Sequence, residues 1–472
     1  MKLVTRYYQN VRYVSGPLLF LEGGRHFCNG AIVDILLPDG EKRTGQVLEI
    51  SEEHTIVQVV EATDRIGLQG TAITLRESAA KLKLSPAMLG RVYNGSGRPI
   101  DGLDEGVYAE KRDINGAPIN PVARAKPDLF IETGITAIDA FNTLVRGQKL
   151  PVFSGAGLPA NEIVSFLLEN ARSGGDDGKD DELVVVFGAM GITRREAAAY
   201  MDRIRISKSA RRLITFMNLA DDPTIERLIT PRCALTAAEY FAFTLGMHVL
   251  VVLTDITNYC EALREVSAAR EEIPGRRGYP GFMYTDLASL YERAGIIDGK
   301  PGSITQIGVL TMPDDDITHP IIDLTGYITE GQIVLDRRLH RRGVMPPIDV
   351  LPSLSRLMNN GIGKGKTRED HRDLVNQLYA SYANGIDVRR LASIVGEEAL
   401  TELDKKYLDF AHRFETELVN QGTRKRSVLE SLDKGWELLR SIPKSELSRV
   451  NKELINRFYS EIMEDGTKTP FY

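Results

Sequence analysis

The first 75 residues alternate short apolar runs, rich in β-branched residues, with residues typical of turns. Three such runs span residues 31–37, 45–50 and 55–60. Between the first two lies Pro38-Asp39-Gly40, where proline presets φ and glycine tolerates positive φ, so the pair of runs predicts a hairpin. The pattern predicts a small all-β domain over residues 1–75, built as a barrel.

Residues 76–352 have a different pattern, in which strongly apolar runs alternate with longer segments of helical period. The runs span residues 150–154, 183–188, 213–217, 248–255 and 304–310. Strands that are apolar almost throughout are typical of a parallel sheet covered by helices on both faces. We therefore expect a central α/β domain with a parallel sheet, whose ligand would lie at the carboxyl ends of the strands.

Residues 353–472 follow the 3.6-residue period of amphipathic helices. Ser427 and Glu430 have the spacing of a capping box, which predicts a helix start there. The apolar positions that define three helices are Leu403, Tyr407, Phe410, Ala411, Phe414 and Leu418; Leu432, Trp436 and Leu439; and Leu447, Val450, Leu454, Phe458 and Ile462. These residues predict a C-terminal helical bundle.

Composition and charge narrow the functional classes. The 472 residues are 42% hydrophobic and 26% charged, with a formal net charge of −6, which provides no basic field for nucleic acid. The apolar runs are far shorter than the roughly 20 residues of a membrane-spanning helix, and the N-terminus does not resemble a signal peptide, so we expect a cytoplasmic protein. Cys28, Cys233 and Cys260 are too scattered for a disulfide framework or a metal site, and we expect buried thiols and no bound metal.

A glycine-rich turn follows the run at residues 150–154 and precedes a helical segment at residues 163–171. Strand, turn and helix N-terminus form the backbone of a P-loop, which holds phosphate through backbone N–H groups. The motif G-x-x-x-x-G-K-[ST] also needs a lysine for the phosphates and a hydroxyl for Mg²⁺. Counted from Gly155, those positions carry Ala160, Asn161 and Glu162. The sequence predicts a degenerate P-loop that stays empty, and an ordinary strand-to-helix turn is the alternative.

Three other segments have the composition of sites. Residues 360–367 end in Gly365-Lys366-Thr367, but no buried strand precedes them, so we favour a solvated basic turn over a phosphate site. Asp255 ends an apolar run and could hold Mg²⁺ through water, yet we favour its role as a helix N-cap. The acidic run at residues 314–316 is expected to be a solvated loop.

The chain resembles the head subunits of rotary ATPases in four segments, at residues 253–265, 274–281, 326–333 and 351–360. The degenerate loop from Ser154 to Glu162 makes the resemblance closest to the B subunit, the non-catalytic partner, of V-type and archaeal-type ATPases. The resemblance spans nearly the whole chain. It implies three domains: a β-barrel at 1–75, a RecA-like α/β domain at 76–352 and a helical domain at 353–472.

The resemblance also implies roles for individual residues. Ile192 stands where catalytic relatives have the glutamate that polarises water, and a hydrocarbon side chain cannot do this. Arg356 corresponds to an arginine finger that acts on a neighbouring subunit's nucleotide, with a surface salt bridge as the alternative. Tyr327 is a weaker candidate for lining the same interface, with simple packing as the alternative. The loop at residues 274–281 corresponds to one that faces the rotor, and a rigid surface turn is the alternative. Arg276 and Arg277 receive no individual roles.

The partners implied are a catalytic A subunit, alternating with this chain as three copies of each, a central rotor stalk and peripheral stalk subunits. ATP or ADP with Mg²⁺ would bind at the interface with A, with no cofactor held by this chain alone. The complex would sit peripherally at the cytoplasmic face of the cell membrane and couple ATP synthesis or hydrolysis to H⁺ or Na⁺ transport. A passive scaffold subunit and an autonomous ATPase that uses Lys366 and Thr367 are the alternative hypotheses.

Overall fold

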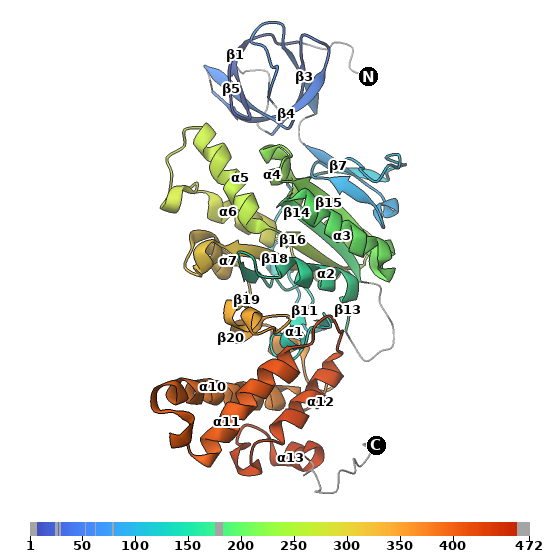
Figure 1. Ribbon diagram of the computed structural model, residues 1–472. Coiled ribbons are helices and arrows are strands. Elements are labelled where there is room, and N and C mark those ends of the chain that lie inside the picture. The colour runs from blue at the N-terminus through green and yellow to red at the C-terminus, as the bar shows by residue number, and fades with distance from the viewer. Residues whose placement is uncertain are drawn as a thin grey trace. The chain divides into compact units, whose positions relative to one another are not determined.

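The computed structural model describes residues 7–23, 27, 30–51, 53–61, 63–77, 80–174 and 183–459. The chain folds into two compact units (Figure 1). The first contains Met1–Ala125, Val184–Thr311 and Ile317–Ile328, and the second contains Lys126–Leu183, Met312–Asp316 and Thr329–Tyr472. The segment predicted as the central domain therefore contributes to both units.

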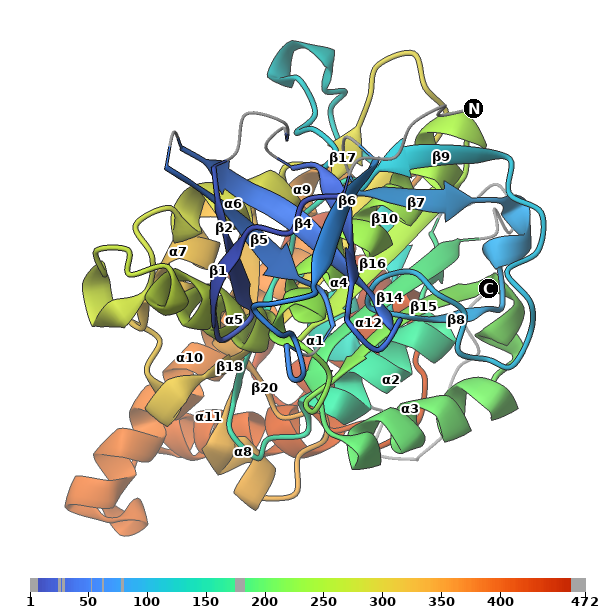
Figure 2. The same cartoon turned by 90° about the horizontal axis from the view of Figure 1, so that it is seen from above.

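The N-terminal domain is the predicted β-barrel domain, built from a six-stranded antiparallel sheet (Figure 1, Figure 2). The strand order is β1-β2-β5-β4-β3-β6. The hairpin predicted around Pro38 joins β3 to β4, with Leu36 opposite Lys42. Its core consists of alternate side chains from the strands, such as Leu19, Val33 and Val57. The strands are β1 (Val11–Ser15), β2 (Leu18–Glu22), β3 (Ile32–Leu36), β4 (Lys42–Ile50), β5 (His54–Val59) and β6 (Ala72–Glu77).

The first unit also holds a parallel sheet of order β8-β15-β14-β16-β18. Four of these strands were predicted from their apolar runs, and all four are buried along most of their length. The strands are β8 (Val92–Asn94), β14 (Val184–Ile192), β15 (Leu213–Leu219), β16 (His248–Thr254) and β18 (Ser303–Met312), with β17 (Gly295–Ile296) antiparallel to β18.

Helices accompany this sheet, as the alternating pattern predicts. The helix α3 packs against β15, and α4 packs against β14, β15 and β16. The main helices are α3 (Arg194–Ile206), α4 (Thr224–Glu239), α5 (Ile256–Ala269), α6 (Met283–Tyr291) and α7 (Pro320–Ile328), with a π-helical turn η4 (Tyr240–Thr244) and a separate strand pair of β7 (Lys81–Leu84) and β9 (Glu110–Asp113).

The second unit contains a smaller strand group and its helices. The strand β12 (Val152–Gly155) pairs in parallel with β19 (Gly331–Leu335), which pairs antiparallel with β20 (Ile348–Ser355). The remaining elements of this part are β10 (Phe130–Glu132), β11 (Leu144–Val145), β13 (Arg172–Ser173), α1 (Thr136–Asp139), α2 (Ala160–Asn170) and α8 (Arg337–Arg341). The sequence predicted β12 and α2, which together carry the glycine-rich turn.

The C-terminal part is helical, as predicted, around an aromatic core. The rings of Tyr382 and Phe414 stack at 4.2 Å between centroids, and Trp436 is 1% exposed. The capping box at Ser427 and Glu430 is present and starts α12. The helices are α9 (Met358–Gly361), α10 (His371–Val395), α11 (Glu402–Arg413), the π-helical turn η8 (Phe414–Val419), α12 (Val428–Leu439) and α13 (Lys452–Phe458).

One predicted helix is shorter than the apolar spacing indicated. The helix α13 begins only at Lys452, because Asn451 caps it there. Leu447 and Val450 are buried from irregular backbone that precedes the helix, and Ile462 lies outside the described residues. Leu447 and Val450 therefore match the spacing of a helix because they are buried, although they lie outside the helix.

Two general predictions can be compared with the structure. No helix in the described part of the chain combines the length and the apolar character needed to cross a membrane. Cys233 and Cys260 are buried free thiols, and burial raises the pKa of Cys233 to about 12, which makes this thiol unreactive. Cys28 lies outside the described residues.

Candidate functional site

The glycine-rich turn has the backbone of a phosphate cradle. The strand β12 ends at Gly155, and α2 starts at Ala160, so the turn leads directly into a helix N-terminus. Ala160, Asn161 and Glu162 form the first turn of α2, and Glu162 is exposed there. The predicted strand, turn and helix are present, but the positions that need a lysine and a hydroxyl carry neither.

An ion pair lies against the start of this turn. Arg337 donates from Nε and Nη2 to both carboxylate oxygens of Asp315, at 2.8 and 2.9 Å, and from Nη2 to the carbonyl of Ala156 at 2.8 Å. A Cβ on Gly155 would lie 2.0 Å from Oδ1 of Asp315. Glycine is therefore required at position 155 by the close approach of a carboxylate.

The Asp315–Arg337 ion pair gives the turn no net positive charge for a phosphate. The hydrogen bonds from Arg337 lower the pKa of Asp315, so the group is an anion at neutral pH. Because Arg337 is paired with this carboxylate, the two opposite charges largely cancel for a group at the turn. The turn supplies neither the lysine nor the hydroxyl that a P-loop uses for nucleotide phosphates and Mg²⁺.

The acidic run was expected to be only a solvated loop, and this prediction missed the ion pair. Asp315 belongs to the short helix η6 (Pro313–Asp315) and is partly exposed. Its partners lie more than twenty residues away along the chain in either direction. No local pattern in the sequence signals such a contact.

The second glycine-rich motif folds on itself. It follows α9 rather than a strand. Lys366 Nζ donates to the carbonyl of Asn360 at 2.5 Å, and the hydroxyl of Thr367 accepts from the N–H of Gly363 at 3.0 Å and contacts Nδ1 of His371 at 3.0 Å. Both side chains that a phosphate site would need are used within the turn.

Asp255 is the helix cap that we favoured. It is the N-cap of α5 and accepts from the N–H of Thr257 at 2.7 Å, and it also accepts from the hydroxyl of Thr311. Ile192 ends β14 and is 4% exposed. Among the residues that the structure describes, no group of His, Cys, Asp or Glu side chains could hold a metal ion.

Arg356 directly follows β20, whose end is firmly held. Ser355 Oγ donates to the carbonyl of Thr143 at 3.0 Å and accepts from Nε2 of Gln148 at 2.9 Å. The N–H of Arg356 donates to the carbonyl of Glu330 at 2.9 Å. The guanidinium is exposed, and the single hydrogen bond found for it in the described part of the chain runs from Nη1 to the carbonyl of Thr329 at 3.4 Å. A fixed backbone thus carries a cation with most of its donors free.

The other candidate residues lie in the first unit. Tyr327, near the end of α7, is 73% exposed. In the loop at residues 274–281, Gly275 N–H donates to the carbonyl of Tyr279 at 2.8 Å, and Arg276 lies 3.8 Å from Asp323. Both arginines of this loop are exposed.

Fold and turn together define the class: an α/β protein with a parallel sheet and a P-loop-like turn that lacks the lysine and the hydroxyl of the P-loop motif. Residues 134–355 match the model of the ATP synthase alpha/beta family nucleotide-binding domain, and residues 360–459 match the C-terminal domain of V and A type ATP synthase.

Known proteins resemble the chain over nearly its full length. It is 56% identical over 469 residues to the V-type ATP synthase beta chains of two strains of Thermus thermophilus, covering 98% of this chain and 98% of each relative. The solved structure of the ATP synthase subunit NeqB from Nanoarchaeum equitans superposes with a TM-score of 0.71 at 37% identity, covering 90% of this chain and all of the other. The chain belongs to the V-type ATP synthase beta-chain family, the B subunits.

Proposed function

We propose that this B-type chain is the non-catalytic, regulatory subunit in the head of a V/A-type rotary ATP synthase, and that Arg356 acts as an arginine finger on nucleotide held by the neighbouring catalytic A subunit. The observation that carries the proposal is the guanidinium of Arg356, which is exposed, has one long hydrogen bond and follows an anchored strand. The Gly155 turn supports the non-catalytic part, because Asn161 and Glu162 stand where a P-loop has its lysine and its hydroxyl residue.

The chemistry of arginine suits this role. In phosphoryl transfer the transition state spreads negative charge over the equatorial oxygens of the transferred group, and an arginine supplied in trans stabilises that charge. The planar guanidinium can donate two parallel hydrogen bonds to such a group. Because the backbone of Arg356 is fixed, little ordering is needed when the nucleotide site forms.

The proposed assembly is the one that the family resemblance implies. Three copies of this chain would alternate with three A subunits around the rotor stalk, with peripheral stalk subunits outside and ATP or ADP with Mg²⁺ at the A–B interfaces. Tyr327 supplies an exposed aromatic ring for the same interface, and the loop at residues 274–281 faces the rotor. The complex is peripheral to the cytoplasmic face of the cell membrane and couples ATP synthesis or hydrolysis to transport of H⁺ or Na⁺.

The experiment is Arg356→Ala in a head reconstituted with the A subunit. Steady-state ATP hydrolysis should fall by a factor on the order of 10³, because the loss of an arginine finger typically costs this much. Arg372 is the matched control, since it is also exposed and donates to one carbonyl, that of Asn359, at 3.4 Å. Arg372→Ala should hydrolyse ATP at the wild-type rate.

Assembly must be measured beside the rate. If Arg356→Ala assembles normally and hydrolyses ATP at the wild-type rate, the arginine-finger proposal is wrong and a passive scaffold is the better description. If the chain alone hydrolyses ATP, the non-catalytic assignment is wrong.

A further inference from the structure

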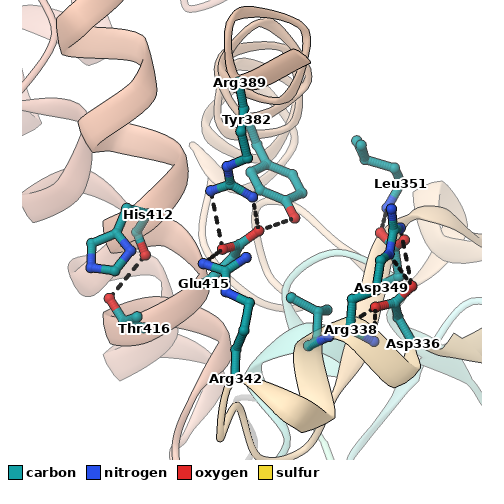
Figure 3. Close-up of polar contacts among 11 residues, drawn as sticks. Asp336, Arg338, Arg342, Asp349, Leu351, Tyr382, Arg389, His412, Glu415 and Thr416 are labelled. Carbon is teal, nitrogen blue, oxygen red and sulfur yellow. Dashed lines mark hydrogen bonds and ion pairs between the residues drawn. The ribbon is translucent and has the colours of Figure 1, made fainter. Parts of the chain in front are cut away.

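Glu415 is a buried carboxylate that joins three separate segments of the second unit. It is 2% exposed and lies on the π-helical turn η8. Arg389 donates to its two oxygens at 2.8 and 3.2 Å, Tyr382 donates its hydroxyl at 3.0 Å, and Arg342 forms an ion pair with it from the opposite side (Figure 3). We call these four residues the Glu415 cluster.

The cluster connects the helical domain to the segment that leads into β20. Tyr382 and Arg389 lie on α10, whereas Arg342 is the C-cap residue of α8. Asp336 fixes the other end of α8, because its carboxylate accepts from the N–H groups of Arg338 and Leu339 at 2.7 and 2.8 Å. The backbone of Arg342 is therefore fixed at the end of the short capped helix α8, and its side chain is fixed by the buried carboxylate of Glu415.

Further hydrogen bonds continue this connection along the chain. Met345 donates its N–H to Oδ1 of Asn420 at 3.0 Å, and its carbonyl accepts from the N–H groups of Gln421 and Gly422, both at 2.9 Å. Tyr379 on α10 donates its hydroxyl to the carbonyl of Leu351 within β20 at 2.9 Å. The strand β20, which Arg356 follows, is thus tied to the helical domain before its start and again in its middle.

Because Glu415 is buried, its ion pairs and hydrogen bonds are important for stability. A buried carboxylate is costly unless it is fully paired, and Glu415 meets two guanidinium groups and one hydroxyl. Charge-assisted hydrogen bonds of this kind are about twice as strong as neutral ones. π-Helical turns are rare and frequently occur at functional sites. The ion pair with Arg342 connects Glu415 to the C-terminal end of α8.

We propose that Arg342, through its ion pair with Glu415, is a positioning residue that sets the place of Arg356 relative to the helical domain. The proposal rests on the proposed function, since it gives Arg342 an effect on catalysis only by way of the arginine finger. Movement of the helical domain would be transmitted along the Glu415 cluster and β20 to the guanidinium. Displacement of a reacting group by about 1 Å can cost up to a hundredfold in rate.

The test is Arg342→Gln in the head reconstituted with the A subunit. Glu415 keeps Arg389 and Tyr382 in this variant, so the buried carboxylate stays paired. The kcat of ATP hydrolysis should fall on the order of 10-fold, with KM for ATP unchanged. Arg390→Gln is the control, because it removes the same charge from an exposed pair with Asp387 inside α10, and it should leave kcat unchanged. Arg342→Lys keeps the charge and should restore part of the rate.

A double-mutant cycle separates positioning from a merely structural effect. In the Arg356→Ala background, Arg342→Gln should cause no further loss, because its effect passes through Arg356. If the two losses multiply, or if Arg342→Gln alone has the wild-type kcat, the positioning proposal is wrong. If Arg356→Ala itself has no effect, the proposed function fails instead. Should Arg342→Gln fail to assemble, the same cycle with Arg342→Lys decides the question.

Discussion

At the scale of residues, three arginines close together in the sequence have different surroundings. Arg337 is paired with Asp315 and with the carbonyl of Ala156. Arg342 is paired with Glu415. Within the described residues, the guanidinium of Arg356 makes one hydrogen bond, at 3.4 Å. The surroundings of each arginine thus determine its role: Arg337 contacts the Gly155 turn, Arg342 connects two segments, and Arg356 is left with free donors for a partner.

His371 is a buried residue with a consequence for stability. Nε2 donates to the carbonyl of Ala140 at 2.8 Å, and Nδ1 lies 3.0 Å from the hydroxyl of Thr367. Burial lowers the pKa of His371 to about 4, although the Ala140 carbonyl and the nearby Asp370 oppose this shift. The imidazole is therefore neutral in the folded protein at pH 7.

The lowered pKa of His371 makes the stability of the folded protein depend on pH, because proton binding and folding are linked. Between pH 6.5 and pH 4 the unfolded chain binds a proton at His371 that the folded chain does not. This contribution to stability is fully present above pH 6.5 and is lost as the pH falls through that range. From about pH 7 to about pH 5 the loss amounts to about 2 kcal/mol of unfolding free energy.

Urea unfolding at about pH 7 and at about pH 5 measures the contribution of His371 to the unfolding free energy. Trp436 is the single tryptophan of the chain, and its indole donates to Asp370 at 2.6 Å, so its fluorescence reports on this region. His371→Gln should reduce the pH dependence by about 2 kcal/mol. The exposed His340 provides the control His340→Gln, which should retain it. An unchanged dependence in His371→Gln would contradict the account.

At the scale of elements, apolar runs predicted the buried strands well. The runs at residues 183–188, 213–217, 248–255 and 304–310 contain or overlap β14, β15, β16 and β18, because a strand buried on both faces has to be apolar throughout. The predicted helix extended too far toward the N-terminus of α13, because Leu447 and Val450 are buried without being helical. The spacing of apolar residues indicates which side chains are buried, whereas the N-cap residue Asn451 marks where α13 begins.

The cap of α12 gives a prediction at this scale. Ser427 accepts from the N–H of Glu430 at 3.2 Å, and Glu430 accepts in return from the N–H of Ser427 at 2.7 Å. Ser427→Ala leaves an N–H of the first turn without its partner and should lower the unfolding free energy by about 1 kcal/mol.

The same Trp436 fluorescence measures this loss, since Trp436 lies on α12. Ser448→Ala, at an exposed serine outside the described helices, should have the wild-type midpoint in urea. Equal midpoints for the two variants would show that the cap does not stabilise α12.

At the scale of the whole molecule, the sequence predicted the site in part. The Gly155 turn and its missing lysine are local features, because strand, turn and helix follow one another in the chain. The contact of Asp315 with Gly155 and the Glu415 cluster join residues far apart in sequence, and no spacing rule announces such contacts. Arg356 was assigned from family resemblance, and its anchored backbone became visible only in the fold.

We propose that this chain completes, through Arg356, a nucleotide site that the A subunit holds. The most direct measurement is a structure of the head with the A subunit and a nucleotide analogue, in which the distance from the Arg356 guanidinium to the γ-phosphate oxygens is read. The account predicts a charge-assisted hydrogen bond of about 2.7–2.9 Å. A guanidinium that faces solvent, beyond roughly one Debye length of about 8 Å from the γ-phosphate, would contradict it.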